Sequence, residues 1–437
     1  MEILRRIIFI TIIFFYSIYV HYLYALIGNT FYYVEGYNFN LAIPFYYSAL
    51  TIIFSVIPAF FFNIRNSLPS NYVLTILYLI HIIPSIVFFP FCCKDINFNN
   101  LIWLIFISLS YASFILFYNI LGNFRINMKR IYIKKMSKYL KPSRYYFLLF
   151  VMSLFALLYL FHTFKGFKNI SIFHVYEIRH IYKENVDKLT AYFVINVGYI
   201  LSPFLTIVAF EKKSLYGFIY LILGIILSLI IFTNTGFKSV AFMWVYVIFW
   251  FFVFKKFNIS NLAFKVVFVF ILSIWIINLI GFILNLDFLY LHWIRRLILS
   301  AGMNTTYFYD YITSNELYFL NNAPNVISLQ YFGTNGSANT GLLGDGFTRY
   351  RYVGVFLNYL LLFFILKILD SLFLKLRDNN HKCIMIAMLF PISYALSYSK
   401  TSSILLTYGL ILLIILMYGR LYFEHKNLPH FNRSSNI

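Results

Sequence analysis

Residues 216–232 read YGFIYLILGIILSLIIF, and no charged side chain interrupts this run. A helix needs about 20 predominantly apolar residues to cross about 30 Å of hydrocarbon. Similar runs recur along the chain of 437 residues, of which 62% are hydrophobic and only 11% charged. A soluble domain needs a larger polar share than this. The sequence therefore predicts an all-α polytopic membrane protein, with residues 1–437 forming a single integral membrane domain.

Twelve apolar segments can be drawn as transmembrane helices, with both termini on the cytoplasmic side. The first resembles a signal peptide, but it is long and lacks a small-residue cleavage site, so we expect it to be retained. In this topology most of the 35 Lys and Arg residues fall in cytoplasmic loops, in agreement with the positive-inside rule. The predicted spans are 7–28, 41–63, 72–90, 101–121, 146–163, 191–210, 216–232, 240–254, 262–284, 352–373, 383–398 and 404–421.

Two predicted periplasmic loops are long, residues 164–190 and 285–351, and we expect short helices in them. The net charge of +21 does not indicate nucleic acid, because the cations lie in short loops between apolar runs. Cys92 and Cys93 are adjacent, and Cys383 lies on the other side of the membrane, so neither a disulfide nor a metal site is expected. The asymmetric loops argue against a transporter built from repeated halves and favour a membrane enzyme that works at the outer surface.

The first long loop contains HVYEIRHIYKENVDK, residues 174–188. Cations in outer loops are informative because they run against the positive-inside bias. Glu177, Arg179 and His180 are candidates for the chemistry, although a solvated amphipathic helix on the outer leaflet explains the whole segment as well. The hairpin TNTGFKSVAF, residues 233–242, adds Lys238. A lone cation at this depth needs a partner, either an acid or a ligand phosphate.

The second long loop includes LHWIRRLILSAGMNTTYFYDYI, residues 291–312, which places His292, Arg295 and Arg296 at the interface. The planar guanidinium group suits a diphosphate because it gives paired hydrogen bonds to phosphate oxygens. Snorkelling to lipid phosphate is the plainer interpretation for one Arg. It explains a doublet on the outer leaflet less well, because anionic lipid attraction acts mainly on the cytoplasmic leaflet.

The same loop ends with FGTNGSANTGLLGDGFTRYRYVGVF, residues 332–356. Its glycines predict tight, irregular backbone, and a plain Gly-rich loop is the default interpretation. Asn339, Asp345, Arg349 and Arg351 could instead hydrogen-bond sugar hydroxyls or phosphates. The chain has no Walker loop, no HExxH and no serine-hydrolase elbow. No acidic cluster suggests a divalent metal, so neither a metal nor a cofactor is predicted.

These segments together resemble the O-antigen polymerase family (Wzy-type oligosaccharide repeat-unit polymerases). The resemblance covers the layout of about a dozen spans and two long outer loops. Locally it rests on the arginine segment, the Asn/Gly loop and the TNTGFKSVAF hairpin. The sequence departs from the family pattern at Lys238, where arginine is commoner, at Ser300–Ala301, where proline is usual, and at Arg351, where glycine is expected.

The resemblance implies a GT-C-like, metal-independent glycosyltransferase of the bacterial inner membrane, without a cofactor. The donor would be a growing glycan on undecaprenyl diphosphate, and the acceptor one lipid-linked repeat unit. Membrane lipid and a chain-length regulator would be further partners, and nucleic acid would not. The residues assigned to diphosphate or glycan binding are Arg179, Lys238, Arg295, Arg296, Asn339, Arg349 and Arg351. The candidates for the catalytic base or hydroxyl orienter are His180, Glu177, Asp345 and His292.

Two other functions stay open at this point. An O-antigen ligase also uses arginines to bind a diphosphate and also has a long outer loop, but the presence of two long basic loops favours the polymerase. A repeat-unit flippase also has about a dozen helices. It should carry its cations in a cavity among the spans, where this sequence has few ionisable residues.

Overall fold

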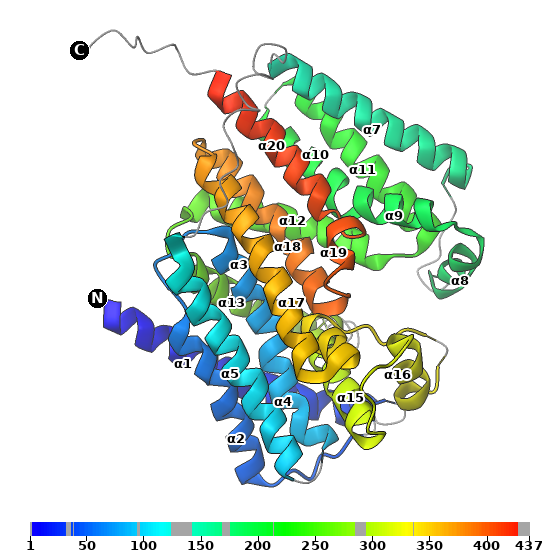
Figure 1. Ribbon diagram of the computed structural model, residues 1–437. Coiled ribbons are helices and arrows are strands. Elements are labelled where there is room, and N and C mark those ends of the chain that lie inside the picture. Colours follow the sequence, from blue (N-terminus) through cyan, green and yellow to red (C-terminus); the bar gives the residue numbers. More distant parts are fainter. Residues whose placement is uncertain are drawn as a thin grey trace. The chain divides into compact units, whose positions relative to one another are not determined.

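The computed structural model describes residues 2–31, 36–37, 39–93, 97–123, 142–167, 175–212, 214–284, 294–334 and 336–426. These residues are largely helical, and none of them lies in a strand (Figure 1). The chain is a multi-pass helical membrane protein, because nine helices in the described ranges are long and apolar enough to cross a bilayer. The nine are Glu2–Phe31, Pro69–Cys92, Phe98–Ile120, Arg144–Phe164, Lys188–Glu211, Leu215–Thr235, Lys238–Phe257, Leu262–Gly281 and Leu342–Lys375.

The three other predicted spans also coincide with helices. Residues 41–63 contain α2 (Phe45–Val56) and η1 (Ile57–Phe61), which form one short apolar helix. Residues 383–398 lie in α18 (Asn379–Tyr398), and residues 404–421 overlap α20 (Leu410–Lys426). Each predicted apolar segment therefore corresponds to helix, while the number of spans stays a prediction.

Contacts group the chain into two compact units. Unit 1 comprises Met1–Phe124, Ser260–Leu366 and Ser393–Thr401, and unit 2 comprises Arg125–Ile259, Lys367–Ile392 and Ser402–Ile437. The prediction of one membrane domain for residues 1–437 stays a prediction.

Unit 1 is built around a helix whose side chains are all buried from Pro69 to Phe91. This helix consists of α3 (Pro69–Leu77), the π-helical turn η2 (Tyr78–Ile82) and α4 (Ile83–Cys92). Apolar side chains predominate on all of its faces, as expected for a helix enclosed by others, and α4 contacts α1, α2 and α15. The other elements of unit 1 are α1 (Glu2–Phe31), α5 (Phe98–Ile120), η3 (Leu121–Asn123), α13 (Leu262–Ile283), η6 (Arg295–Leu299), α15 (Ser300–Ser314), α16 (Ala323–Phe332) and most of α17 (Leu342–Lys375).

Unit 2 is arranged around α11 (Leu215–Thr235), which lies against α7 (Pro142–Phe164) and α10 (Ser202–Glu211). The helix α12 (Lys238–Phe257) contacts both α10 and α11. The remaining elements of unit 2 are α8 (Val175–Asn185), α9 (Lys188–Asn196), the π-helical turn η5 (Val197–Leu201), most of α18, α19 (Ser403–Leu406) and α20.

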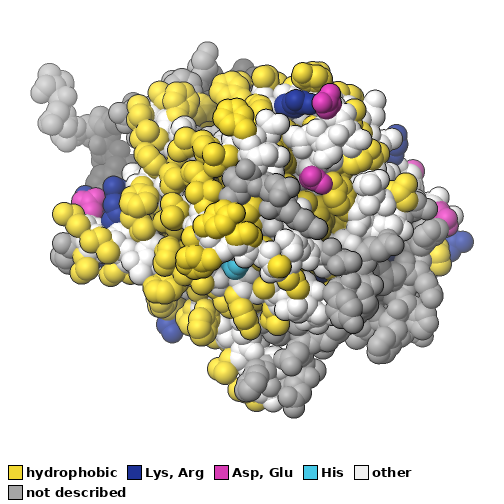
Figure 2. All heavy atoms as spheres, turned by 90° about the horizontal axis from the view of Figure 1, so that it is seen from below, with side chains coloured by type: hydrophobic (Ala, Val, Ile, Leu, Met, Phe, Trp, Pro, Cys, Tyr) yellow, Lys and Arg dark blue, Asp and Glu magenta, His cyan; other side chains and the backbone are white. Residues whose placement is uncertain are grey.

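Outward-facing side chains are largely apolar. On α7, for example, Phe147, Leu148, Val151, Phe155 and Leu158 are exposed. Figure 2 shows a face on which hydrophobic side chains cover wide areas and charged ones are few. Water-soluble monomers rarely expose apolar patches beyond a few hundred Å², so these surfaces fit contact with lipid.

The helix α17 is broken at Arg351, whose φ of 47° is not helical. The short piece before the break folds back on the long piece after it, and the Asn358 amide donates a hydrogen bond to the Leu342 carbonyl at 2.9 Å. A Cβ atom on Gly354 would lie 2.0 Å from the Gly346 carbonyl oxygen. The two glycines therefore permit the close approach of the pieces.

Candidate functional site

The arginine doublet lies in η6, one of three π-helical turns in the described chain. The turns η2 and η5 are followed by Pro84 and Pro203, each at the second position after the turn. A wider turn accommodates proline, which cannot donate the usual helical hydrogen bond and clashes with the carbonyl four residues earlier. In η6 the equivalent position is Ala301. In η6 the π-helical turn is stabilised instead by Ser300, whose hydroxyl donates a hydrogen bond to the Arg295 carbonyl at 2.8 Å.

The helix α15 approaches α4 at very short range. A Cβ atom on Gly302 would lie 2.4 Å from the carbonyl carbon of Pro84 and 2.5 Å from the nitrogen of Ser85. Three residues further on, the Thr305 hydroxyl is 2.9 Å from Nε2 of the buried His81. These contacts fix the position of η6, and with it the position of Arg295, within unit 1.

The two arginines of the doublet have different surroundings. Arg295 is buried, with 8% of its surface exposed, whereas Arg296 is exposed. The guanidinium carbon of Arg295 lies 5.1 Å from the ring centroid of Phe31 and 4.9 Å from that of Tyr37. Both distances fall within the 6 Å range of cation–π attraction. The side chain of Arg295 is therefore fixed between aromatic rings, whereas that of Arg296 lies at the surface.

An aromatic strip connects the surroundings of Arg295 with Asp310. Tyr37 lies 6.0 Å from Phe332, Phe332 lies 5.7 Å from Tyr307, and Tyr307 stacks on Tyr331 at 4.4 Å (centroid distances). We define the aromatic strip as Tyr37, Phe332, Tyr307 and Tyr331. Because η6 and α15 form one continuous helix, Arg295 and Asp310 lie about 22 Å apart along it.

Asp310 is held by a tyrosine of this strip. The Tyr331 hydroxyl donates a hydrogen bond to Oδ2 of Asp310 at 2.5 Å. Burial and the neighbouring carboxylate raise the pKa of Tyr331 well above its usual range, so the hydroxyl keeps its proton. The second oxygen of Asp310 can accept a hydrogen bond from another hydroxyl. Asp310 and Tyr331 are not among the residues predicted from the sequence.

The Asn/Gly loop is tied to the same helix. The Asn304 amide donates to the Asn339 carbonyl at 2.7 Å, and the hydroxyls of Thr305 and Thr340 are 2.8 Å apart. The side chain of Asn339 itself is exposed. The loop predicted to contact glycan thus lies beside the arginine segment of unit 1, and Asn339 faces solvent.

Asp345, Arg349 and Arg351 lie around the start of α17. Asp345 is buried and forms an ion pair with Arg349 at 3.3 Å, and the Arg349 side chain is 43% exposed. The Nε atom of Arg351 donates to the Leu317 carbonyl at 3.0 Å, and its guanidinium carbon lies 4.3 Å from the ring centroid of Tyr318. These contacts give Arg351 a structural function at the break in α17, while Arg349 stays open to a ligand.

In unit 2 the first long loop contacts the hairpin that carries Lys238. Arg179 donates to the Gly236 carbonyl at 3.0 Å, and its guanidinium carbon lies 5.4 Å from the ring centroid of Phe237. Lys238 begins α12 and is half-buried. Glu177 and His180 lie on the same helix as Arg179, but their side chains, like the whole of His292, are outside the described residues.

A second charged group of unit 2 was not predicted. Arg420 is buried and forms an ion pair with Glu211 at 2.8 Å. The Nε2 atom of His381 lies 3.3 Å from the other oxygen of Glu211. The group links α10, α18 and α20, and a structural function explains it, because a buried ion pair joins helices without needing a ligand.

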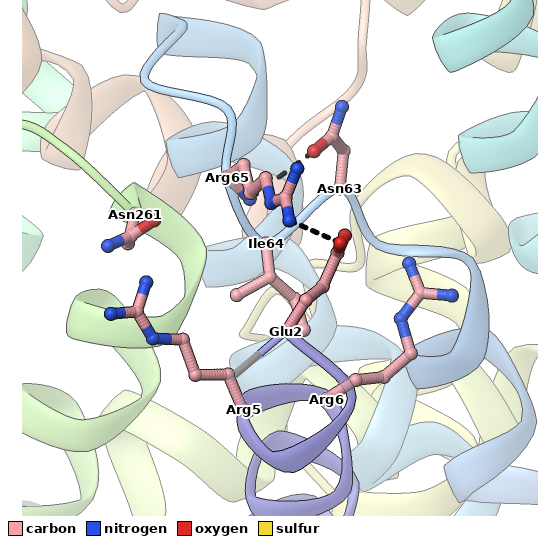
Figure 3. A pocket seen from close by; sticks show the side chains of 7 residues that line it. All are labelled: Glu2, Arg5, Arg6, Asn63, Ile64, Arg65 and Asn261. Carbon is pink, nitrogen blue, oxygen red and sulfur yellow. Dashed lines mark hydrogen bonds and ion pairs between the residues drawn. The ribbon is translucent and has the colours of Figure 1, made fainter.

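A cationic pocket of about 200 Å³ lies at the start of α1 (Figure 3). In Figure 3, Arg5 and Arg6 lie on opposite sides of Glu2, and Arg65 reaches Glu2, with which it forms an ion pair. Arg295 contacts Phe31 at the other end of the same 30-residue helix, which is about 45 Å long. The pocket and Arg295 therefore lie at opposite ends of α1. Exposed arginines at the predicted cytoplasmic end fit contact with anionic lipid head groups.

Comparisons with family models, with curated proteins and with solved structures find no match to this chain.

Proposed function

We propose that this chain is a membrane glycosyltransferase that polymerises undecaprenyl-diphosphate-linked repeat units at the periplasmic face of the bacterial inner membrane. The proposal includes twelve spans, cytoplasmic termini and a GT-C-like architecture. One observation carries it: a buried arginine stands at one end of an aromatic strip, and a held carboxylate stands at the other. Aromatic faces are suited to sugar rings, whose C–H groups are apolar, and guanidinium groups are suited to diphosphate.

The spacing of Arg295 and Asp310 supports an acceptor site. In repeat-unit polymerisation the acceptor's own diphosphate and its reacting hydroxyl lie at opposite ends of one oligosaccharide. An acceptor site therefore needs a cation and a general base that are several sugar rings apart, and about 22 Å along one helix meets this need. We assign the acceptor diphosphate to Arg295, the sugar rings to the partly exposed Tyr331 and Phe332 of the aromatic strip, and the terminal hydroxyl to Asp310.

The chemistry then follows from these assignments. The Asp310 carboxylate takes the proton of the acceptor hydroxyl, and the hydroxyl oxygen attacks the anomeric carbon of the growing chain. The bond from that carbon to the donor diphosphate breaks, and undecaprenyl diphosphate leaves with the electron pair. Cations that neutralise this leaving group lower the barrier, and the assignment of Arg179 and Lys238 to diphosphate or glycan binding stays a prediction. The predicted alternatives for the base are Glu177, His180, His292 and Asp345.

The first test is the surface lipopolysaccharide of a strain that lacks this protein, separated on a gel. We expect core that bears a single repeat unit and no ladder, because flipping and ligation still work. Core without any repeat unit would instead indicate the ligase or the flippase, and would contradict the polymerase.

Variants expressed in the same strain test the two ends of the site. Arg295→Ala and Asp310→Asn should abolish the ladder at normal protein levels, and Arg295→Lys should shorten it, because lysine keeps the charge and loses the paired hydrogen bonds. Arg65→Ala and Glu316→Gln are matched controls, since both residues are exposed, and they should restore full ladders. A full ladder from Arg295→Ala would refute the assignment.

A further inference from the structure

Cys92, Cys93 and Asp310 bring three potential metal ligands together in unit 1. Cys92 ends α4 and Cys93 follows it, while Asp310 lies on α15, the helix that contacts α4. The two Sγ atoms and a carboxylate oxygen all lie within 4.8 Å of one another. Two adjacent cysteines lack metal-ligand spacing in the sequence, and the fold adds the third ligand from a distant helix.

The geometry is close to that of a bound metal ion. A tetrahedral Zn²⁺ with bonds of about 2.3 Å to sulfur and about 2.0–2.2 Å to oxygen spaces its ligand atoms roughly 3.5–3.8 Å apart. The three atoms lie within 4.8 Å of one another, so a bound ion would have to draw each pair closer by at most about 1.3 Å. Cys92 and Asp310 are only half-buried, which gives an ion access to the site, and Cys93 is buried.

The carboxylate of Asp310 is also oriented by a residue that is not itself a metal ligand. Tyr331 donates to Oδ2 of Asp310, which holds the group and leaves its other oxygen for a metal. Such outer hydrogen bonds commonly orient metal ligands and tune affinity. Three ligands from the protein leave the fourth tetrahedral position for water.

We propose that Cys92, Cys93 and Asp310 form a Zn²⁺ site, and that an ion bound there stops polymerisation. Thiolate ligands favour soft cations such as Zn²⁺ over Mg²⁺ or Ca²⁺. Binding releases the protons of the two thiols to solvent, and the divalent cation offsets two of the three negative charges of its ligands. The ion occupies the carboxylate that would otherwise accept the proton of the acceptor hydroxyl. The inhibition rests on the proposed function, but the metal binding does not.

Metal binding is tested with the reduced full-length protein in detergent, titrated with Co²⁺ as a coloured substitute for Zn²⁺. We expect one equivalent to bind, with a sulfur-to-cobalt charge-transfer band that Zn²⁺ removes. Cys92→Ser and Cys93→Ser should each abolish the band, and Asp310→Asn should weaken binding at least about tenfold. Cys383→Ser is the matched control, because this third cysteine lies in unit 2, and it should leave the band unchanged.

Three results would overturn the site: no band, a band that survives both serine variants, or a Cys92–Cys93 disulfide found by mass spectrometry in the protein as isolated. Undiminished binding by Asp310→Asn would overturn the three-ligand assignment. Inhibition is tested separately by adding Zn²⁺ to polymerising vesicles. Activity that persists with the site occupied would refute inhibition and leave the metal site standing, so the two parts fail independently.

Discussion

Replacing Gly302 with alanine should disturb the contact that positions Arg295. The new Cβ atom would lie 2.4 Å and 2.5 Å from backbone atoms of Pro84 and Ser85, and backbone cannot rotate away as a side-chain tip can. Overpacking of this kind typically costs 1–3 kcal/mol, and we expect about 3 kcal/mol because backbone must move. That cost corresponds to a fall of roughly 6–12 °C in the unfolding midpoint for a unit of this size.

The assay is thermal unfolding of the purified protein in detergent, followed by circular dichroism. Gly122→Ala is the matched control, because a Cβ atom at Gly122 would have no neighbour within 4 Å, and its midpoint should stay within about 2 °C of the wild type. When each variant is expressed in the strain that lacks this protein, Gly302→Ala should give a shortened lipopolysaccharide ladder and Gly122→Ala a full one. If Gly302→Ala unfolds at the wild-type temperature, or if both variants fall equally, the close approach of α15 and α4 is wrong.

Three further predictions concern stability and use the same unfolding assay. Arg351→Gly should be about 1 kcal/mol more stable than Arg351→Ala, since both lose the guanidinium contacts and only glycine tolerates the positive φ without strain; equal midpoints would contradict this. Asp187 caps α9, and its hydrogen bond from a backbone N–H lowers the pKa of the carboxylate below its ordinary 3.8. The difference in stability between wild type and Asp187→Ala should therefore be largest at neutral pH and shrink as the pH falls through that lowered pKa. A stability difference that grows on acidification would refute this prediction. Glu211→Gln and Arg420→Met should each lower the free energy of unfolding by about 3–5 kcal/mol. The double variant should lose less than the sum of the two single losses, because the two side chains form one ion pair. Losses that add up strictly would rule out a coupled pair.

The helical architecture could be predicted because long apolar runs have few alternatives in a bilayer. Each predicted segment coincides with helix, since length and hydropathy alone decide this feature. The π-helical turn at Arg295 was not predicted. Pro84 and Pro203 are visible signals for such turns, but Ala301 at the equivalent position is not. At Arg351, by contrast, the resemblance gives a signal for the local backbone, because it leads one to expect glycine and the residue has a positive φ.

The candidate site could be predicted only in part, because its members are far apart in sequence. Arg295 was selected for its charge and its unusual side of the membrane. Asp310 is not among the residues predicted from the sequence, because only the fold gives it its partner Tyr331. The pairing of Cys92 with Asp310 was equally hidden. Sequence patterns report periodicity and charge, whereas contacts between distant helices depend on packing.

The most direct test of the central claim uses the purified protein in vesicles with an undecaprenyl-diphosphate-linked repeat unit as both donor and acceptor. The account predicts release of undecaprenyl diphosphate and a ladder of lipid-linked products, both lost with Arg295→Ala and with Asp310→Asn. It also predicts no transfer to added lipid A core. Transfer to lipid A core without any lipid-linked ladder would contradict the account and identify a ligase.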